Sequence, residues 1–361
     1  MKEIFEHPDS SKYLLFATTG SWVDQLVQDI LAAKHYVYVE TFRLNDDVVG
    51  QRVGQAMLLK AAEGLDVKLI VDSWGTRKSK LIADMEKGGV CVRYFKKIIL
   101  TFNLFGRNHT RNHRKIVAID DQVSYIGSAN FSKWSLKWRE SILRVENHDL
   151  ARIFKRIFLE NFEIYKKKIK KRKYYKTINH DGFKIIRETP SIMHQKSKNY
   201  FMNLINKAKK NVTIVTPYFL TGKSMRDKLA KAVKRGVKVT VILPKHSDVR
   251  SVDYLRDLFL GTLYRNGIRL KLFKSGNIHA KMVMIDDHVF SIGSTNFDYR
   301  SFRYMHEINL SGEKPEISQL VKEYMDDTLT ECSDFNYARW VLRPLHQKII
   351  GMMLYPIRRL M

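Results

Sequence analysis

Short apolar runs rich in β-branched residues alternate along the chain with longer amphipathic stretches. The runs at residues 35–44, 63–72 and 88–96 have the length and composition of buried strands. Stretches of the second kind, such as SMRDKLAKAVKRG at 224–236, have helical spacing and end in a glycine. Because strands and helices follow one another in this way, the pattern predicts an α/β fold.

The same order of elements occurs twice. Residues 211–220, 234–243 and 266–274 repeat the three runs of the first half. Each half predicts strand, helix, strand, helix, strand and loop, followed by a hairpin, which is clearest where 281–285 and 289–293 flank a polar turn. We therefore predict two similar mixed-sheet α/β halves flanked by helices.

The junction between the halves is expected near residue 170, which gives domains 1–170 and 171–361. A helix with apolar residues at helical spacing comes first, and KKKIKKRKYYK at 166–176 follows it. The apolar positions of this helix are Ile153, Phe154, Ile157, Phe158, Phe162 and Tyr165. Eight of the eleven residues at 166–176 are Lys or Arg, so this basic segment is either a solvated linker or a contact with an anionic surface.

Composition limits the kinds of partner that the protein can bind and the kinds of site and segment that it can contain. The chain has 361 residues, 44% of them hydrophobic, and a formal net charge of +27, which favours anionic partners such as phospholipid or nucleic acid. Two distant cysteines argue against a disulfide framework or a zinc site. We expect no signal peptide, because acidic residues and a proline occupy the N-terminal segment where a signal peptide needs a cationic region and then an unbroken apolar one. We expect no transmembrane helix, because no apolar run approaches the roughly 20 residues that cross a bilayer.

A motif of the form HxKxxxxD occurs in both halves. Its residues are His113, Lys115 and Asp120 in the first half and His279, Lys281 and Asp286 in the second, each pair 166 residues apart. GSAN at 127–130 and GSTN at 293–296 follow at the same offset. Chance does not readily repeat seven identities at matched spacing, so the two copies indicate a shared chemical role.

These residue types suit the transfer of a phosphodiester. The lysines and the GSxN side chains can neutralise phosphate oxygens and donate hydrogen bonds to them. The predicted phosphate ligands, besides Lys115 and Lys281, are Ser128, Asn130, Ser294 and Asn296. One neutral histidine attacks phosphorus while the other, protonated, donates to the leaving oxygen, which requires neither metal nor cofactor.

The carboxylates of the motif leave two interpretations open. Asp120 and Asp286 end the motif strands, seven residues after each histidine and on the other side of the pleat, so a turn role and a catalytic role remain equal. Better candidates to hold each imidazole tautomer are Glu140, 27 residues after His113, and Glu307, 28 residues after His279.

Paired HxKxxxxD and GSxN motifs resemble those of the phospholipase D superfamily. The stretches TPYF (216–219), RGVKVTVILP (235–244) and HAKMVMIDDHVFSIGSTNFDYRSF (279–302) look like those of bacterial cardiolipin synthases. The resemblance implies one active site between the halves, with one motif histidine as nucleophile and the other as acid. It also implies conversion of two phosphatidylglycerol molecules to cardiolipin and glycerol through a phosphohistidine. A hydrolase releasing phosphatidic acid and a metal-independent nuclease are the alternatives.

Two further segments are predicted to contact the membrane or the substrate. The C-terminal residues 339–361 mix apolar and aromatic side chains with cations, which suits either a bilayer interface or packing on the protein core. The loop 96–112 is expected to line the substrate entrance. His109 in this loop and His113 are four residues apart, a spacing that two metal ligands can have, but no third ligand is apparent. We expect a peripheral protein on the cytoplasmic side of a bacterial membrane, with phosphatidylglycerol rather than nucleic acid as partner.

Overall fold

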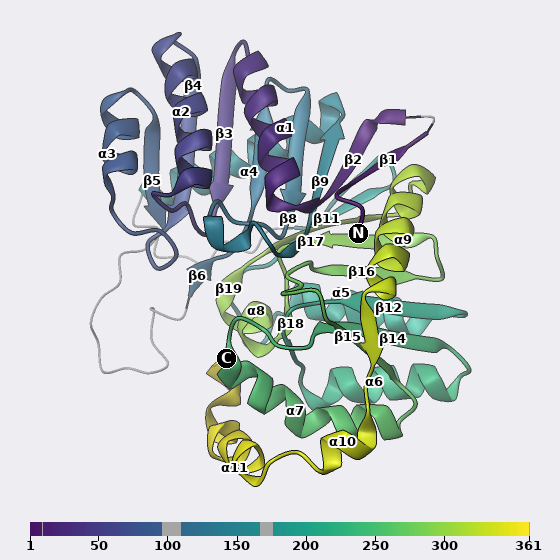
Figure 1. The fold of residues 1–361 in the computed structure, drawn as a ribbon. Coiled ribbons are helices and arrows are strands. Elements are labelled where there is room, and N and C mark those ends of the chain that lie inside the picture. Colours follow the sequence, from purple (N-terminus) through teal and green to yellow (C-terminus); the bar gives the residue numbers. More distant parts are fainter. Residues whose placement is uncertain (9, 96–109, 167–175, 361) are drawn as a thin grey trace.

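The computed structural model describes residues 1–8, 10–95, 110–166 and 176–360. They form two α/β halves, each built on its own mixed sheet (Figure 1). The first sheet draws its strands from residues 4–146 and the second from residues 178–334. The predicted α/β architecture with two similar halves is confirmed.

In the first half, the two strands of the motif hairpin pair antiparallel with each other and with their neighbours in the sheet. The strands that helices connect pair in parallel with one another. The strand order is β1 (Ile4–His7), β2 (Ser10–Thr18), β9 (Arg139–Glu146), β8 (Val123–Gly127), β7 (Ile116–Ile119), β3 (Tyr36–Thr41), β4 (Asp66–Asp72) and β5 (Cys91–Phe95). The helices are α1 (Thr19–Ala32), α2 (Val48–Ala62), α3 (Lys80–Lys87), the 3-10 helix η2 (Lys133–Ser135) and α4 (His148–Lys166). The hydrophobic pattern did not reveal β1 and β2.

The second half repeats this order around its own motif hairpin. Its strand order is β10 (Ile178–His180), β11 (Phe183–Arg187), β20 (Ile308–Gly312), β17 (Val289–Gly293), β16 (Met282–Ile285), β12 (Asn211–Val215), β14 (Lys238–Pro244), β15 (Arg269–Phe273) and β21 (Cys332–Asp334). The helices are α5 (Lys196–Lys207), α6 (Lys223–Lys234), α7 (Arg250–Arg265), α8 (Tyr299–Tyr304), α9 (Pro315–Thr330), α10 (Tyr337–Val341), α11 (Leu345–Leu354) and the 3-10 helix η3 (Tyr355–Leu360).

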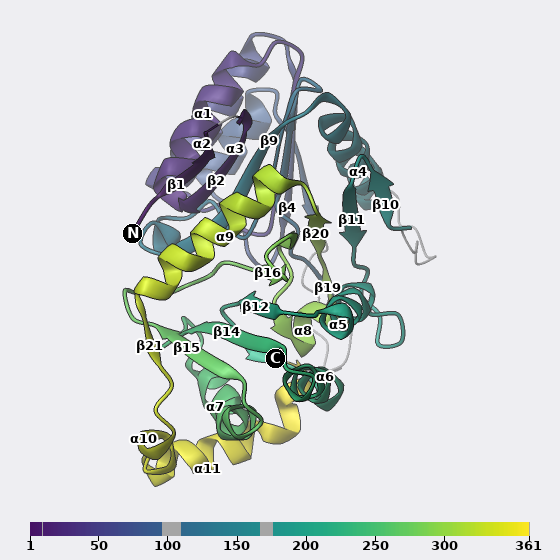
Figure 2. The same ribbon diagram turned by 90° about the vertical axis from the view of Figure 1, so that its right-hand side faces the viewer.

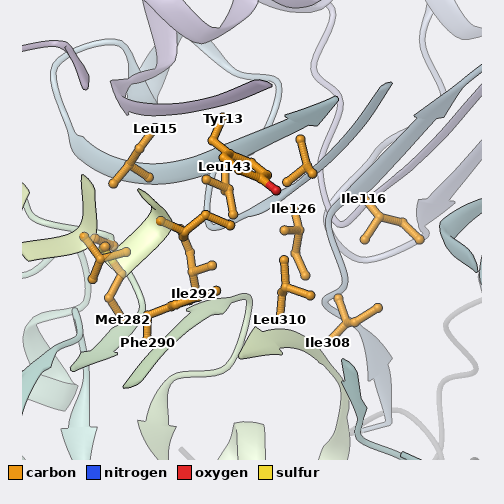
Figure 3. Close-up of a cluster of buried hydrophobic side chains, with 14 of the residues drawn as sticks. Tyr13, Leu15, Ile116, Ile126, Leu143, Met282, Phe290, Ile292, Ile308 and Leu310 are labelled. Atoms are coloured by element: carbon orange, nitrogen blue, oxygen red, sulfur yellow. The ribbon is translucent and has the colours of Figure 1, made fainter. Parts of the chain in front are cut away.

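The two sheets face each other across a shared hydrophobic core. Ile126 and Leu143 of the first half belong to the same buried cluster as Ile292 and Leu310 of the second half (Figure 3). The predicted apolar face of α4 joins this cluster through Phe154 and Phe158. Because these side chains lose their contact with water only when the halves pack together, the hydrophobic effect holds the halves in fixed positions.

Helix α9 lies between β20 and β21 of the second sheet in sequence, and it packs against both halves. It lies along β1 and β2, as Figure 2 shows, and buries Leu320, Val321 and Tyr324 in the shared core. The Tyr324 hydroxyl donates a 2.7 Å hydrogen bond to the carbonyl of Glu140. This helix therefore fixes the strand that carries one of the candidate site residues.

Candidate active site

The two motif histidines lie just before β7 and β16 and are held by the backbone of the opposite half. The His113 amide donates to the carbonyl of His306 at 2.9 Å, and the His279 amide donates to the carbonyl of Arg139 at 2.7 Å. The short strand β6 (Arg111–Asn112) also pairs in parallel with β19 (Met305–His306) between the halves, as Figure 1 shows. Each half thus positions the histidine of the other.

The glutamates pair with the histidines across the interface. His113 Nδ1 lies 3.0 and 3.1 Å from the two carboxylate oxygens of Glu307, and His279 Nδ1 lies 2.9 and 3.0 Å from those of Glu140. The matched sequence distances led us to expect each glutamate beside the histidine of its own half, and that pairing is wrong. Because each Nδ1 faces a carboxylate, each Nε2 is left to face a substrate.

The motif lysines are buried beside the histidines. Lys115 Nζ donates to the carbonyl of His113 at 2.7 Å, and Lys281 Nζ donates to the carbonyl of His279 at 2.5 Å. Burial lowers the pKa of Lys115 to about 7 and that of Lys281 to about 8. An ammonium group has three donors, so each lysine can also reach phosphate oxygens. An anion between them would relieve the cost of burying two cations.

The serines of GSxN, predicted as phosphate ligands, donate hydrogen bonds to the glutamates in this structure. Ser128 Oγ donates to Glu140 at 2.5 Å, and Ser294 Oγ donates to Glu307 at 2.5 Å. Each serine oxygen also accepts a backbone hydrogen bond, from Ser141 and from Ile308 respectively. Both serines are completely buried. Their hydroxyl protons are therefore committed to holding the carboxylates in place.

The asparagines of GSxN keep an unused hydrogen-bonding group. The side-chain oxygens of Asn130 and Asn296 are buried, and neither has a hydrogen-bond partner among the described residues. Buried amide groups are usually satisfied. The unpaired atoms are acceptors and would not themselves bind an anion. Phosphate binding by the neighbouring amide donors of Asn130 and Asn296 therefore stays a prediction.

The motif aspartates occupy hairpin turns, which favours the turn interpretation over the catalytic one. Asp120 accepts hydrogen bonds from the backbone amides of residues 34–36, and Asp286 from those of residues 209–211. Both have φ of +52°, and the residue after each also has positive φ, as in a type I′ hairpin turn. They lie at the far ends of β7 and β16 from the histidines and anchor the entry to β3 and β12.

The two histidine–glutamate pairs have similar geometry but different electrostatic environments. Burial lowers the pKa of His113 well below its usual value, and the charges of Lys115, Lys281 and Arg300 act in the same direction. Burial also lowers the pKa of His279, but there Glu140 and Asp248 oppose the shift. The surroundings therefore favour a neutral His113 and a protonated His279 more than the reverse.

The pKa values of the two glutamates show the same difference between the two pairs. Burial raises the pKa of Glu307 to about 8, although Lys115 opposes the shift. Burial also tends to raise the pKa of Glu140, but the charge and hydrogen bond of His279 outweigh it, and the pKa lies below its usual value. The His279–Glu140 pair thus has more of the character of an ion pair.

The motif search missed several residues that surround the histidines. The rings of Phe42 and Trp138 lie 5.3 Å from those of His113 and His279 respectively. Arg43, Arg300, Tyr218 and Asp248 flank the site and differ between the halves. Sequence signals for them are the difference between TPYF (216–219) and TFRL (41–44) and the difference between GSTNFDYR and GSANFSKW.

In the part of the chain that the structure describes, no three His, Cys, Asp or Glu side chains gather in a way that would hold a metal ion. The weak metal pair that included His109 lies outside the described residues, as do residues 96–109 of the predicted entrance loop and residues 167–175 of the basic segment.

Comparison with known proteins identifies the family of this architecture. The family described as "Cardiolipin synthase, PLD-like domain" matches residues 26–162 and 201–329. A cardiolipin synthase of Listeria welshimeri is 31% identical over 95% of this chain and 74% of the relative. One of Clostridium perfringens is 28% identical over 93% of this chain and 74% of the relative. The crystal structure of phosphatidylserine synthase from Haemophilus influenzae has the same fold, with a TM-score of 0.77 at 15% identity, covering 100% of this chain and 98% of its own.

Proposed function

Because the chain belongs to the cardiolipin synthase family of phospholipase D-like proteins, we propose that it joins two phosphatidylglycerol molecules into cardiolipin and releases glycerol. The observation that carries the proposal is the pair of buried histidine–glutamate dyads, His113–Glu307 and His279–Glu140, with a buried lysine beside each. Two such dyads supply the nucleophile and the acid that a two-step transfer needs.

In the first step, Nε2 of neutral His113 attacks the phosphorus of the donor phosphatidylglycerol. The bond from phosphorus to the glycerol oxygen breaks, and the proton of His279 passes to that oxygen, so that glycerol leaves and a phosphatidyl-histidine remains. Lys115, Lys281, Asn130 and Asn296 bind the phosphate oxygens. Their charges and donors stabilise the negative charge that grows on these oxygens in the transition state.

In the second step, His279 is neutral and acts as a base. It takes the proton from a hydroxyl of the acceptor phosphatidylglycerol while the hydroxyl oxygen attacks phosphorus. The bond from phosphorus to His113 breaks, cardiolipin leaves, and both histidines return to their starting states. Glu307 and Glu140 keep each imidazole in the tautomer that the two steps need.

The purified protein should convert phosphatidylglycerol in mixed micelles to cardiolipin and glycerol in equal amounts, as measured by mass spectrometry. The yield should be unchanged by EDTA, because the two steps use only side chains. Phosphatidic acid without cardiolipin would identify a hydrolase instead. Cleavage of single-stranded DNA with no lipid product would identify a nuclease.

We also propose that the protein binds the membrane from one side through its C-terminal surface, defined here as residues 341–360. Among the described helices, none has the length and apolarity needed to cross a bilayer. In this surface, Leu342 is 83% exposed, Leu345 68% and Met353 74%, and cations including Arg359 lie among them. Exposed apolar side chains with neighbouring cations suit the boundary between headgroups and acyl chains of anionic lipids.

The position of this surface links it to the active site. Helix α11 packs on α7, where Gly351 allows close approach because a Cβ atom there would lie 2.8 Å from the carbonyl oxygen of Tyr254. The following 3-10 helix η3 packs against α8, which carries Arg300. A bilayer in contact with the C-terminal surface would therefore lie close to the helix that borders the site.

Replacing Leu345 and Met353 with glutamate should weaken binding to phosphatidylglycerol vesicles by roughly tenfold or more, because two apolar side chains lose their burial in lipid. Sedimentation of the protein with vesicles measures the bound fraction. Met193→Glu is the matched control, since Met193 is 86% exposed but lies outside the C-terminal surface. Equal losses in the control and in the double variant would contradict this assignment.

A further inference from the structure

The two sides of the active site differ in charge although the halves repeat each other. On the side of His279, the Tyr218 hydroxyl donates a 2.7 Å hydrogen bond to Asp248. The bridge between Leu44 and Phe131 corresponds to the pairing of β13 (Phe219–Leu220) with β18 (Phe297–Asp298), which makes Arg43 the counterpart of Tyr218. The side of His113 thus has a cation where the side of His279 has a tyrosine paired with a carboxylate.

Arg300 adds a second cation to the side of His113. The repeat offset places Arg300 opposite Trp134 of the first half, so this arginine also has no equivalent. Its guanidinium lies 5.1 Å from the ring centre of Trp74, and the guanidinium of Arg111 lies 5.2 Å from the same ring. The charges of Arg300 and Arg43 both reach the site, because they lower the pKa of His113 and of Lys115 respectively.

Arg300 has no anionic partner within the described part of the chain. It donates no hydrogen bond there, its Nε is buried without an acceptor, and no carboxylate lies within 4.0 Å of its guanidinium. Residues 96–109, which lie outside the described part of the chain, contain neither Asp nor Glu. A partly buried guanidinium whose Nε–H has no acceptor is costly unless a ligand supplies one.

Asp298 and Asp72, the two carboxylates that interact electrostatically with Arg300, already have other partners. Asp298 accepts a 2.6 Å hydrogen bond from the amide of Ser301, and Asp72 accepts from the amides of Asn112 and Trp74 and pairs with Arg111 at 3.6 Å. These contacts fix both aspartates at the ends of local backbone segments. The excess positive charge beside His113 is therefore available to an anion from outside the chain.

We propose that Arg300, together with Arg43, binds a second phosphodiester, the phosphate of the acceptor phospholipid. This inference rests on the proposed function. An acceptor phosphatidylglycerol carries its own phosphodiester three carbons from the attacking hydroxyl, whereas water and simple alcohols carry none. Guanidinium groups bind phosphate through paired, charge-assisted hydrogen bonds. The cations beside His113 would thus select a phospholipid as acceptor and disfavour hydrolysis.

A competition between acceptors tests this selection. The protein receives phosphatidylglycerol as donor and acceptor together with ethanol as a neutral acceptor, and mass spectrometry gives the ratio of cardiolipin to phosphatidylethanol. Arg300→Gln is expected to lower this ratio roughly tenfold or more, because the loss of a charged hydrogen bond affects only the acceptor that carries a phosphate. Arg43→Gln is expected to lower it several-fold.

Arg303→Gln is the matched control, because Arg303 lies on the same helix but rests over the ring of Tyr299 at 5.1 Å. Its ratio should equal that of the unchanged protein. An unaltered ratio in Arg300→Gln would overturn the inference, and if that variant makes neither product, Arg43→Gln decides by the same criterion. If the unchanged protein makes phosphatidylethanol but no cardiolipin, the proposed function itself fails.

Discussion

Replacing His113 with alanine is expected to abolish transfer from every donor, whereas His279→Ala should spare the first step when the leaving group needs no proton. With phosphatidylglycerol, each variant should lose on the order of 10⁴-fold or more in kcat. With a phosphatidyl p-nitrophenol donor, His279→Ala should release one equivalent of nitrophenolate per protein in a burst and then stop. The burst arises because His113 can still attack, while the second step lacks its base.

The burst separates the roles of the two histidines. His113→Ala should show no burst, because the nucleophile is missing. His288→Ala is the control, since His288 is exposed in the hairpin turn after β16 and should keep full activity. A burst from His113→Ala but not from His279→Ala would reverse the assignment. It would also contradict the electrostatic difference between the two dyads.

Because the glutamates and histidines pair across the halves, a change in the glutamate of one half should affect the step that depends on the histidine of the other half. Glu307→Gln should behave like a weakened His113 variant and slow the burst itself by about 10²-fold or more, because His113 loses the carboxylate that orients it. Glu140→Gln should keep the burst and slow turnover, because Glu140 supports His279. Rapid mixing with the nitrophenyl donor measures both phases.

Glutamine keeps the shape of the side chain and an acceptor for the serine beneath it, so these variants test the charge more than the packing. Glu146→Gln, at the exposed end of β9, is the control and should leave both phases unchanged. If Glu140→Gln slowed the burst while Glu307→Gln slowed only turnover, each glutamate would serve the histidine of its own half, and the crossed arrangement would be wrong.

The motifs and the order of elements could be predicted from the sequence because they are local and occur twice. His113 and Lys115 precede a run that is apolar at every position, and the turn at Asp120 has the polar residues of a hairpin. Spacing along the chain could not predict the crossed pairs. The spacings of 27 and 28 residues relate each glutamate to the histidine of its own half, and they do not show which histidine it contacts in the folded protein. Only the packing of β8 and β9 against β17 and β20 decides it.

Other features of the site depend on contacts between residues that are distant in the sequence, and such contacts leave no repeating sequence pattern. Ser128 and Ser294 carry the donors of a phosphate ligand, but the fold turns their hydroxyls toward the glutamates. Arg300 becomes notable only when the three-dimensional arrangement shows that it has no acceptor. Strands β1 and β2 were missed because polar residues interrupt their short apolar pattern, while α9 from the other half covers them.

The central claim is that one site, assembled by both halves, uses His113 as the nucleophile. Mass spectrometry of peptides from the unchanged protein, quenched during turnover of phosphatidylglycerol under conditions that preserve phosphohistidine, tests it most directly. We predict a phosphatidyl group on the peptide that contains His113 and none on the peptide that contains His279. An adduct on His279, with His113 unmodified, would contradict the claim.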